Sequence, residues 1–130
     1  MPSVFSRIIA GELPCYKLAE DDLFIAFLDI QPLAEGHTLV VPKIEVDKMI
    51  DLPEKYLSGI LPFARPVAHA LERAFPDKRC GMSVIGLEVP HAHLHLVPLS
   101  TAGDISFTRP KLSFTPQQML SMQALILQLL

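Results

Sequence analysis

Cysteines, long apolar runs and blocks of like charge are all scarce in this sequence. Its 130 residues include only two cysteines, Cys15 and Cys80. They lie far apart in a chain without an export signal, so we expect two small buried side chains and no structural disulfide. The N-terminal stretch has no basic segment followed by a long apolar core, and no apolar run is long enough to span a bilayer. The sequence therefore predicts a cytoplasmic protein with no membrane partner.

The charge of the chain is small and evenly spread. Its formal value of −3 comes from dispersed acidic and basic residues. This distribution provides no basic patch of the kind that binds nucleic acid, so no nucleic-acid partner is expected. A small ligand that carries phosphate is still compatible with it, because one site can be positive on a mildly acidic protein. Half of the residues are apolar, which is enough for the core of one domain over residues 1–130.

Local patterns predict a mixed fold built around five strands. Ser3 and Gly11 are placed as the cap and the stop of a short helix. The first two predicted strands are joined too tightly for a crossover helix, and so are the last two, which favours an antiparallel sheet and an α+β fold. The five strands are expected at residues 15–21, 23–30, 37–43, 79–86 and 89–99.

A long helix is predicted from Asp51 onward. Asp51 and Glu54 have the spacing of a capping box, and apolar residues recur at helical intervals as far as residue 75. Pro62 and Pro66 fall inside this pattern. Each costs about 3 kcal/mol in a regular helix interior, so we expect a kink or a break there.

A second helix is predicted over residues 116–130, with Thr115 as its cap and Pro116 in its first turn. Apolar residues occupy more than one of its faces. Such a helix needs cover on more than one side, so we expect an oligomer contact.

Three of the five histidines alternate along one apolar stretch, at His91, His93 and His95. Alternate side chains of a strand share a face, so the three rings are expected to lie together. A purely structural role is a poor explanation, because each buried neutral imidazole needs both a donor and an acceptor.

Two chemical roles suit three aligned histidines. In a metal site, the Cα atoms of His91 and His95 would be about 13 Å apart, so all three could not reach one zinc ion. Two of them together with His37 could. In the second role, one neutral imidazole attacks a phosphorus atom while its other nitrogen keeps a proton, and its neighbours donate to phosphate oxygens.

The stretch "HAHLHLV" fits the pattern His-φ-His-φ-His-φ-φ, in which φ is apolar. Together with "FSRIIAGELPCYKLAEDD", "AFLDIQPLAEGHTLVVPK" and "VIGLEVPHAHLHLVPL", it covers most of residues 3–99. On these segments the chain resembles the histidine-triad (HIT) family of nucleotide hydrolases and nucleotidyl transferases, and is most similar to small bacterial Hint-like members. The resemblance implies an α+β fold of about five antiparallel strands with two main helices. It also implies a homodimer with one continuous sheet.

The resemblance further implies roles for individual residues. His93 would be the nucleophile, and His91 would contact the phosphate and leaving group while its carbonyl orients His93. His95 and His37 would form a supporting pair, and Asp29 would hold the ribose hydroxyls. The apolar slot for the purine base would be formed by Val4, Phe5, Ile8 and Phe27.

Two departures from the family pattern affect these expectations. Many members have a glutamine or serine just before the triad, where this chain has Leu87 and Glu88. Glu88 is a candidate nucleotide-binding residue, although alternation along a strand favours a side chain that points to solvent. Some members carry a pair of zinc-ligand cysteines at the places of Ser3 and Ser6, so no structural zinc is predicted here.

These observations lead to a functional prediction. We expect a purine nucleotide hydrolase or nucleotidyl transferase that cleaves a substituent, as in a nucleoside phosphoramidate, from the α-phosphate. A nucleotidyl-histidine intermediate would form, and no metal or other cofactor would be needed. The alternatives are a nucleotide sensor without catalysis, a dinucleoside polyphosphate hydrolase, and a metal-dependent enzyme that chelators inactivate.

Overall fold

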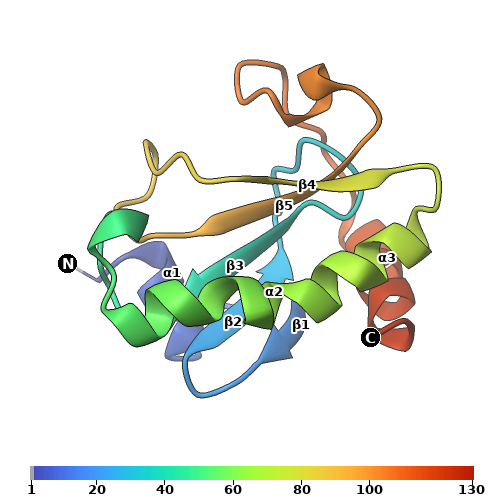
Figure 1. The fold of residues 1–130 in the computed structure, drawn as a ribbon. Coiled ribbons are helices and arrows are strands. Elements are labelled where there is room, and N and C mark those ends of the chain that lie inside the picture. Colours follow the sequence, from blue (N-terminus) through green and yellow to red (C-terminus); the bar gives the residue numbers. More distant parts are fainter. Residues whose placement is uncertain (1) are drawn as a thin grey trace.

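One antiparallel sheet organises the computed structural model, which describes residues 2–130 (Figure 1). The strand order is β1-β2-β3-β5-β4, and each neighbouring pair runs antiparallel. The predicted α+β class and the five strands are therefore confirmed. The strands are β1 (Lys17–Glu20), β2 (Phe24–Leu28), β3 (Thr38–Pro42), β4 (Arg79–Ser83) and β5 (Leu94–Leu99).

Three α-helices accompany the sheet: α1 (Val4–Ile9), α2 (Glu54–Ala74) and α3 (Pro116–Gln128). Ser3 caps α1 through its side chain, and Thr115 caps α3 in a capping box with Gln118, as the sequence predicts. Two short 3₁₀ turns, η1 (Met49–Asp51) and η2 (Ala102–Ile105), precede α2 and follow β5. No helix of the described residues is long and apolar enough to cross a membrane.

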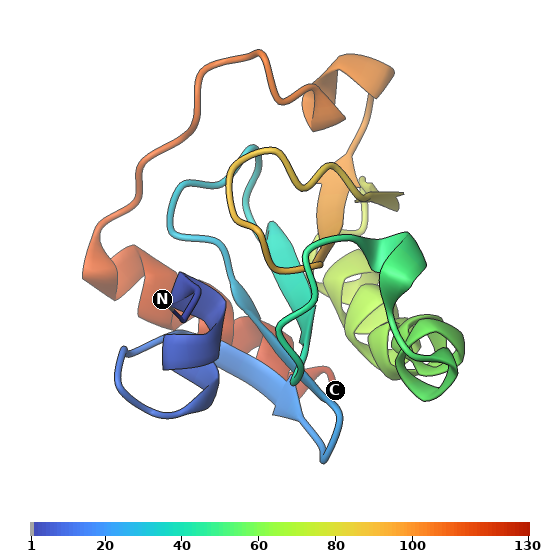
Figure 2. The ribbon, with the colours of Figure 1, turned by 90° about the vertical axis from the view of Figure 1, so that its left-hand side faces the viewer.

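Alternation along the strands separates two apolar cores. On β2, Phe24 and Ala26 belong to the core that α2 and α3 complete, whereas Ile25 and Phe27 point to the other face. That second face is covered by α1, through the side chain of Phe5. Figure 2 shows α1 and α2 on opposite sides of the sheet.

The long helix departs from the prediction in two ways. Pro53 takes the N-cap position without a side-chain cap, so the expected capping box from Asp51 does not form. Pro62 and Pro66 lie within one uninterrupted helix, so a break is excluded. Both prolines are exposed and four residues apart. They therefore share one solvent-facing side, where a carbonyl that loses its helical partner can bond to water.

The last strand begins later than predicted. Its ladder starts at Leu94, so His91 and His93 precede it. Ala92 instead donates its backbone N–H to the carbonyl of Val46 at 2.7 Å. Its side chain still packs in the same core as that of Leu94, so the in-and-out alternation continues beyond the ladder.

The two cysteines are free, as predicted, but they are half-buried and not fully buried as expected.

The loop between β2 and β3 contains a glycine that the fold requires. Gly36 has a φ of 82°, which side chains other than glycine rarely adopt. An added Cβ would lie 2.5 Å from Cε2 of Phe75. We expect Gly36→Ala to lower the free energy of unfolding by about 2 to 4 kcal/mol, through backbone strain and overpacking together.

Gly11→Ala provides the matched control for Gly36→Ala in urea unfolding. Gly11 has a φ of 80° but no atom within 4 Å of the added Cβ. Its substitution should cost only the backbone strain, about 1 to 2 kcal/mol. Equal losses in the two variants would contradict the close contact between Gly36 and Phe75.

Candidate active site

The three histidines of the motif lie on the α1 face of the sheet, at the start of β5. His95 is paired with Leu39 of β3 and points away from the core formed by α2 and α3. The rings of His93 and His95 are 4.8 Å apart between centroids. All three histidines are buried. The expected clustering of the rings on one side is therefore present.

The tautomer of His93 follows from one hydrogen bond. Its Nδ1 lies 2.7 Å from the carbonyl oxygen of His91. Because a carbonyl oxygen only accepts, Nδ1 carries the proton, and the neutral ring keeps its lone pair on Nε2. His93 lines a cavity of about 510 Å³. The ring therefore has the electronic form that a nucleophile needs, beside a space for a ligand.

His95 has the opposite tautomer. The backbone N–H of Leu33 donates to Nδ1 of His37 at 2.9 Å, so the proton of His37 sits on Nε2. That Nε2 lies 3.0 Å from Nδ1 of His95 and donates to it. The proton of His95 is consequently on Nε2. His95 also lines the cavity, so it offers an N–H donor next to the lone pair of His93.

Both ring nitrogens of His91 form hydrogen bonds within the protein. Its Nε2 donates to the carbonyl of Pro42 at 2.9 Å, and its Nδ1 accepts from Oγ of Ser3 at 2.7 Å. The residue has no solvent exposure and does not line the cavity. The carbonyl of His91 lies where the resemblance implies, but its ring is turned toward the start of α1. The expected contact of this ring with phosphate and leaving group therefore needs correction.

Two serines and a glutamate connect this buried ring to α1. The backbone N–H of Ser3 and the hydroxyl of Ser6 both donate to Oε1 of Glu45, at 2.6 and 2.7 Å. Oxygen atoms thus surround the Nδ1 side of His91, without the thiolates that structural zinc sites commonly use. Glu45 has no part in the motif, and no signal in the sequence identifies it.

The cavity brings together only part of the predicted nucleotide site. Five candidates line it: Phe5, Asp29, Glu88, His93 and His95. Five others do not: Val4, Ile8, Phe27, His37 and His91. Of the four residues expected to form the apolar slot for the base, only Phe5 lines the cavity. Phe27 lies beneath Phe5, with ring centroids 5.8 Å apart, and Val4 is 43% exposed on α1.

Both carboxylates of the cavity are available as acceptors. Asp29 receives the backbone N–H of Gln31 at 2.9 Å, and burial raises the pKa of its carboxyl group. Glu88 lies in the loop between β4 and β5, where strand alternation does not apply. It is exposed to solvent, as alternation favoured, and it also lines the cavity, so it stays a candidate nucleotide-binding residue.

A cluster of possible metal ligands is formed by Asp29, His37 and His95, whose nearest ligand atoms lie within 4.8 Å of one another. Nε2 of His37 faces the other two residues, 3.7 Å from Oδ2 of Asp29. Because the amide of Leu33 occupies the lone pair on Nδ1, this Nε2 is protonated and cannot ligate a metal. The cluster therefore does not fit a metal ion, and the metal hypothesis loses the third ligand that it needs.

Acid should destabilise the folded protein through the two paired histidines. Burial lowers the pKa of His37 to about 4 and that of His95 to about 3, from an ordinary value of 6.5. Between pH 4 and pH 6.5, these two histidines bind protons in the unfolded chain but not in the folded chain. The free energy of unfolding is therefore expected to fall as the pH is lowered from 6.5 toward 4.

His37→Gln tests this source of pH dependence, because the amide can accept from Leu33 and donate to His95 without titrating. Urea unfolding at a series of pH values should show a weaker pH dependence than in the parent. His69→Gln, at an exposed position of α2, should keep the parent's dependence. If the free energy of unfolding depends on pH identically in His37→Gln and the parent, His37 is not a source of the pH dependence.

Comparison with known proteins identifies the family of the chain. A HIT domain model matches residues 10–102. A HIT-like protein of Borreliella burgdorferi is 36% identical over 113 residues, which are 82% of this chain and 81% of that protein. An adenosine 5'-monophosphoramidase of Schizosaccharomyces pombe is 36% identical over 99 residues, which are 75% of this chain and 74% of that protein.

Solved structures extend the likeness to nearly the whole chain. A HIT-like protein from Bartonella henselae, described as involved in cell-cycle regulation, superimposes with a TM-score of 0.86 at 26% identity. The match covers 98% of this chain and 96% of that one. The chain belongs to the histidine-triad (HIT) family.

Proposed function

We propose that this protein hydrolyses purine nucleotides at the α-phosphate, with His93 as the nucleophile. The observation that carries the proposal is the opposite protonation of two neighbouring imidazoles at one cavity. His93 presents a lone pair on Nε2, and His95 presents an N–H. An attacking atom beside a hydrogen-bond donor is what transfer of a phosphorus group requires.

The reaction would proceed in two displacements. Nε2 of His93 attacks the α-phosphorus and forms an N–P bond, while the bond to the leaving amine breaks and the amine takes up a proton from solvent. The N–H of His95 stabilises the charge that builds on a phosphoryl oxygen. Water then attacks the same phosphorus, loses a proton to solvent and releases the mononucleotide, and the electrons of the N–P bond return to Nε2.

The residues around the cavity support a nucleoside as the bound portion. The Asp29 carboxylate can accept hydrogen bonds from both ribose hydroxyls. Phe5, Leu39 and Val89 provide an apolar wall for a base. The name of the fission yeast relative, an adenosine 5'-monophosphoramidase, supports an adenosine phosphoramidate as the substrate class.

His93→Ala tests the nucleophile directly. Purified, chelator-treated protein is mixed with an adenosine phosphoramidate of an amine, and AMP release is followed. We expect release by the parent protein and a loss of about three orders of magnitude or more in His93→Ala. His69→Ala, a histidine outside the cavity, should retain the parent rate.

The other outcomes separate the competing functions. Substantial release by a folded His93→Ala variant would remove the nucleophile assignment. A parent protein that binds AMP tightly and turns over no phosphoramidate would favour a nucleotide sensor. Activity that chelators abolish and zinc restores would favour the metal-dependent alternative.

We also propose that the protein is a homodimer, as its family resemblance implies. The edge strand β4 offers an unpaired side for a second copy of the sheet. Leu120 and Leu127 of α3, and Leu130 just after it, are each about half exposed, which supports an additional contact. Sedimentation analysis should give twice the mass of one chain. A single-chain mass at all micromolar concentrations would contradict the proposal.

A further inference from the structure

The segment between β5 and α3 forms a wall of the cavity although it follows the motif. The family model ends at residue 102, and the chain then arches from η2 toward α3 (Figure 2). Three of its residues, Phe107, Thr108 and Lys111, line the same cavity as His93 and His95. No motif in the sequence identified them.

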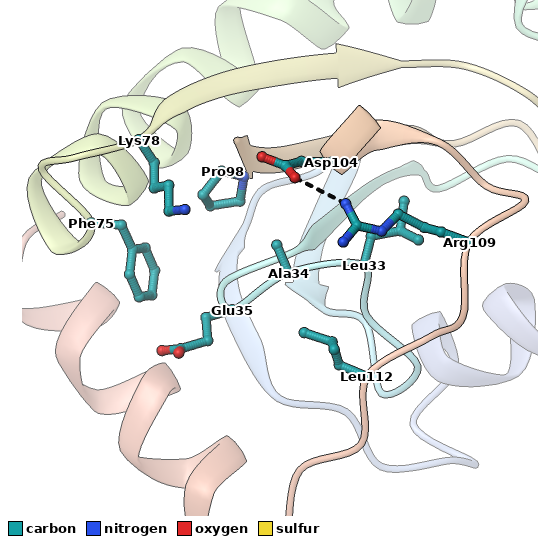
Figure 3. Close-up of a pocket in the computed structure, with 9 residues that line it drawn as sticks. All are labelled: Leu33, Ala34, Glu35, Phe75, Lys78, Pro98, Asp104, Arg109 and Leu112. Atoms are coloured by element: carbon teal, nitrogen blue, oxygen red, sulfur yellow. Dashed lines mark hydrogen bonds and ion pairs between the residues drawn. The ribbon is translucent and has the colours of Figure 1, made fainter. Parts of the chain in front are cut away.

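Hydrogen bonds and an ion pair hold this segment, between residues 100 and 115, in place. The carboxylate of Asp104 accepts the backbone N–H groups of Ser100 and Thr101, at 2.8 and 2.9 Å. It also pairs with Nη1 of Arg109 at 2.9 Å, and both residues line a second hollow (Figure 3). At the far end, the backbone N–H of Leu112 donates to the carbonyl of Pro32 at 2.7 Å. The position of the residues between these bonds is therefore defined by the fold.

Phe107 links the segment to the histidines. Its ring lies edge to face with His95, 4.5 Å between centroids, and 6.2 Å from the ring of His37. Nζ of Lys111 lies 5.4 Å from the centroid of the same phenylalanine. The ammonium group is thus held one aromatic ring away from His95.

The charge of Lys111 has no ionic partner among the described side chains. It nevertheless acts on the site, because its positive charge contributes to the lowered pKa values of His37 and His95 and opposes the burial that raises the pKa of Asp29. Lys111 is the only lysine or arginine among the described residues that line the cavity.

We propose that Lys111 binds a non-bridging oxygen of the α-phosphate, an inference that rests on the function proposed above. Two carboxylates, Asp29 and Glu88, line the same cavity and would repel a phosphate anion. The ammonium group of Lys111, one aromatic ring away from His95, offsets this repulsion at the phosphorus that His93 attacks. Lys111 would therefore be a phosphate ligand supplied from outside the triad.

Binding of AMP and of adenosine to Lys111→Met isolates the phosphate contribution without turnover. By titration calorimetry we expect AMP to bind about tenfold to a hundredfold more weakly than to the parent, because a charge-assisted hydrogen bond is lost. Adenosine should bind as it does to the parent. Lys111→Arg, which keeps the positive charge, should recover most of the affinity for AMP.

Lys78→Met is the matched control, because Lys78 lines the second hollow and not the cavity (Figure 3). It should leave both affinities unchanged. Unchanged AMP binding in Lys111→Met would overturn the inference, and so would an equal loss for AMP and adenosine, which would indicate a role in cavity shape. A parent protein that binds neither ligand would overturn the proposed function as well, so the two failures are distinguishable.

Discussion

The hydrogen bond from Nδ1 of His93 to the carbonyl of His91 is the interaction on which the site depends. It determines which nitrogen of His93 keeps a lone pair, and so whether the ring can attack phosphorus at all. The bond requires His91 to stay in place. Its ring is held between the end of β3 at Pro42 and the cap of α1 at Ser3. The cap of α1 and His93, the proposed nucleophile, therefore belong to one connected network.

Burial and hydrogen bonding keep the paired imidazoles of His37 and His95 neutral. His37 and His95 resist protonation because they are buried, and the amide of Leu33 orders the protons along the pair. A neutral pair can donate to a phosphate oxygen without carrying a charge of its own. In our account the positive charge comes from Lys111, on a segment that packs against the pair through Phe107.

The sequence predicts the local features of the fold well, and the long-range contacts poorly. Alternation along "HAHLHLV" predicts that the rings of His93 and His95 lie on one face, and the structure agrees. The orientation of the ring of His91 could not be predicted, because its partners Ser3 and Pro42 are 88 and 49 residues away. Alternation along a strand could not decide whether Glu88 borders the cavity, because Glu88 lies in a loop. Lys111 carries no motif, and only the folded chain brings it to the cavity.

¹⁵N NMR of the histidine side chains at neutral pH measures directly which ring nitrogen carries the proton. We predict a proton on Nδ1 and none on Nε2 in His93, and the reverse in His37 and His95. A protonated Nε2 in His93, or a proton on Nδ1 of His95, would contradict the arrangement of nucleophile and donor.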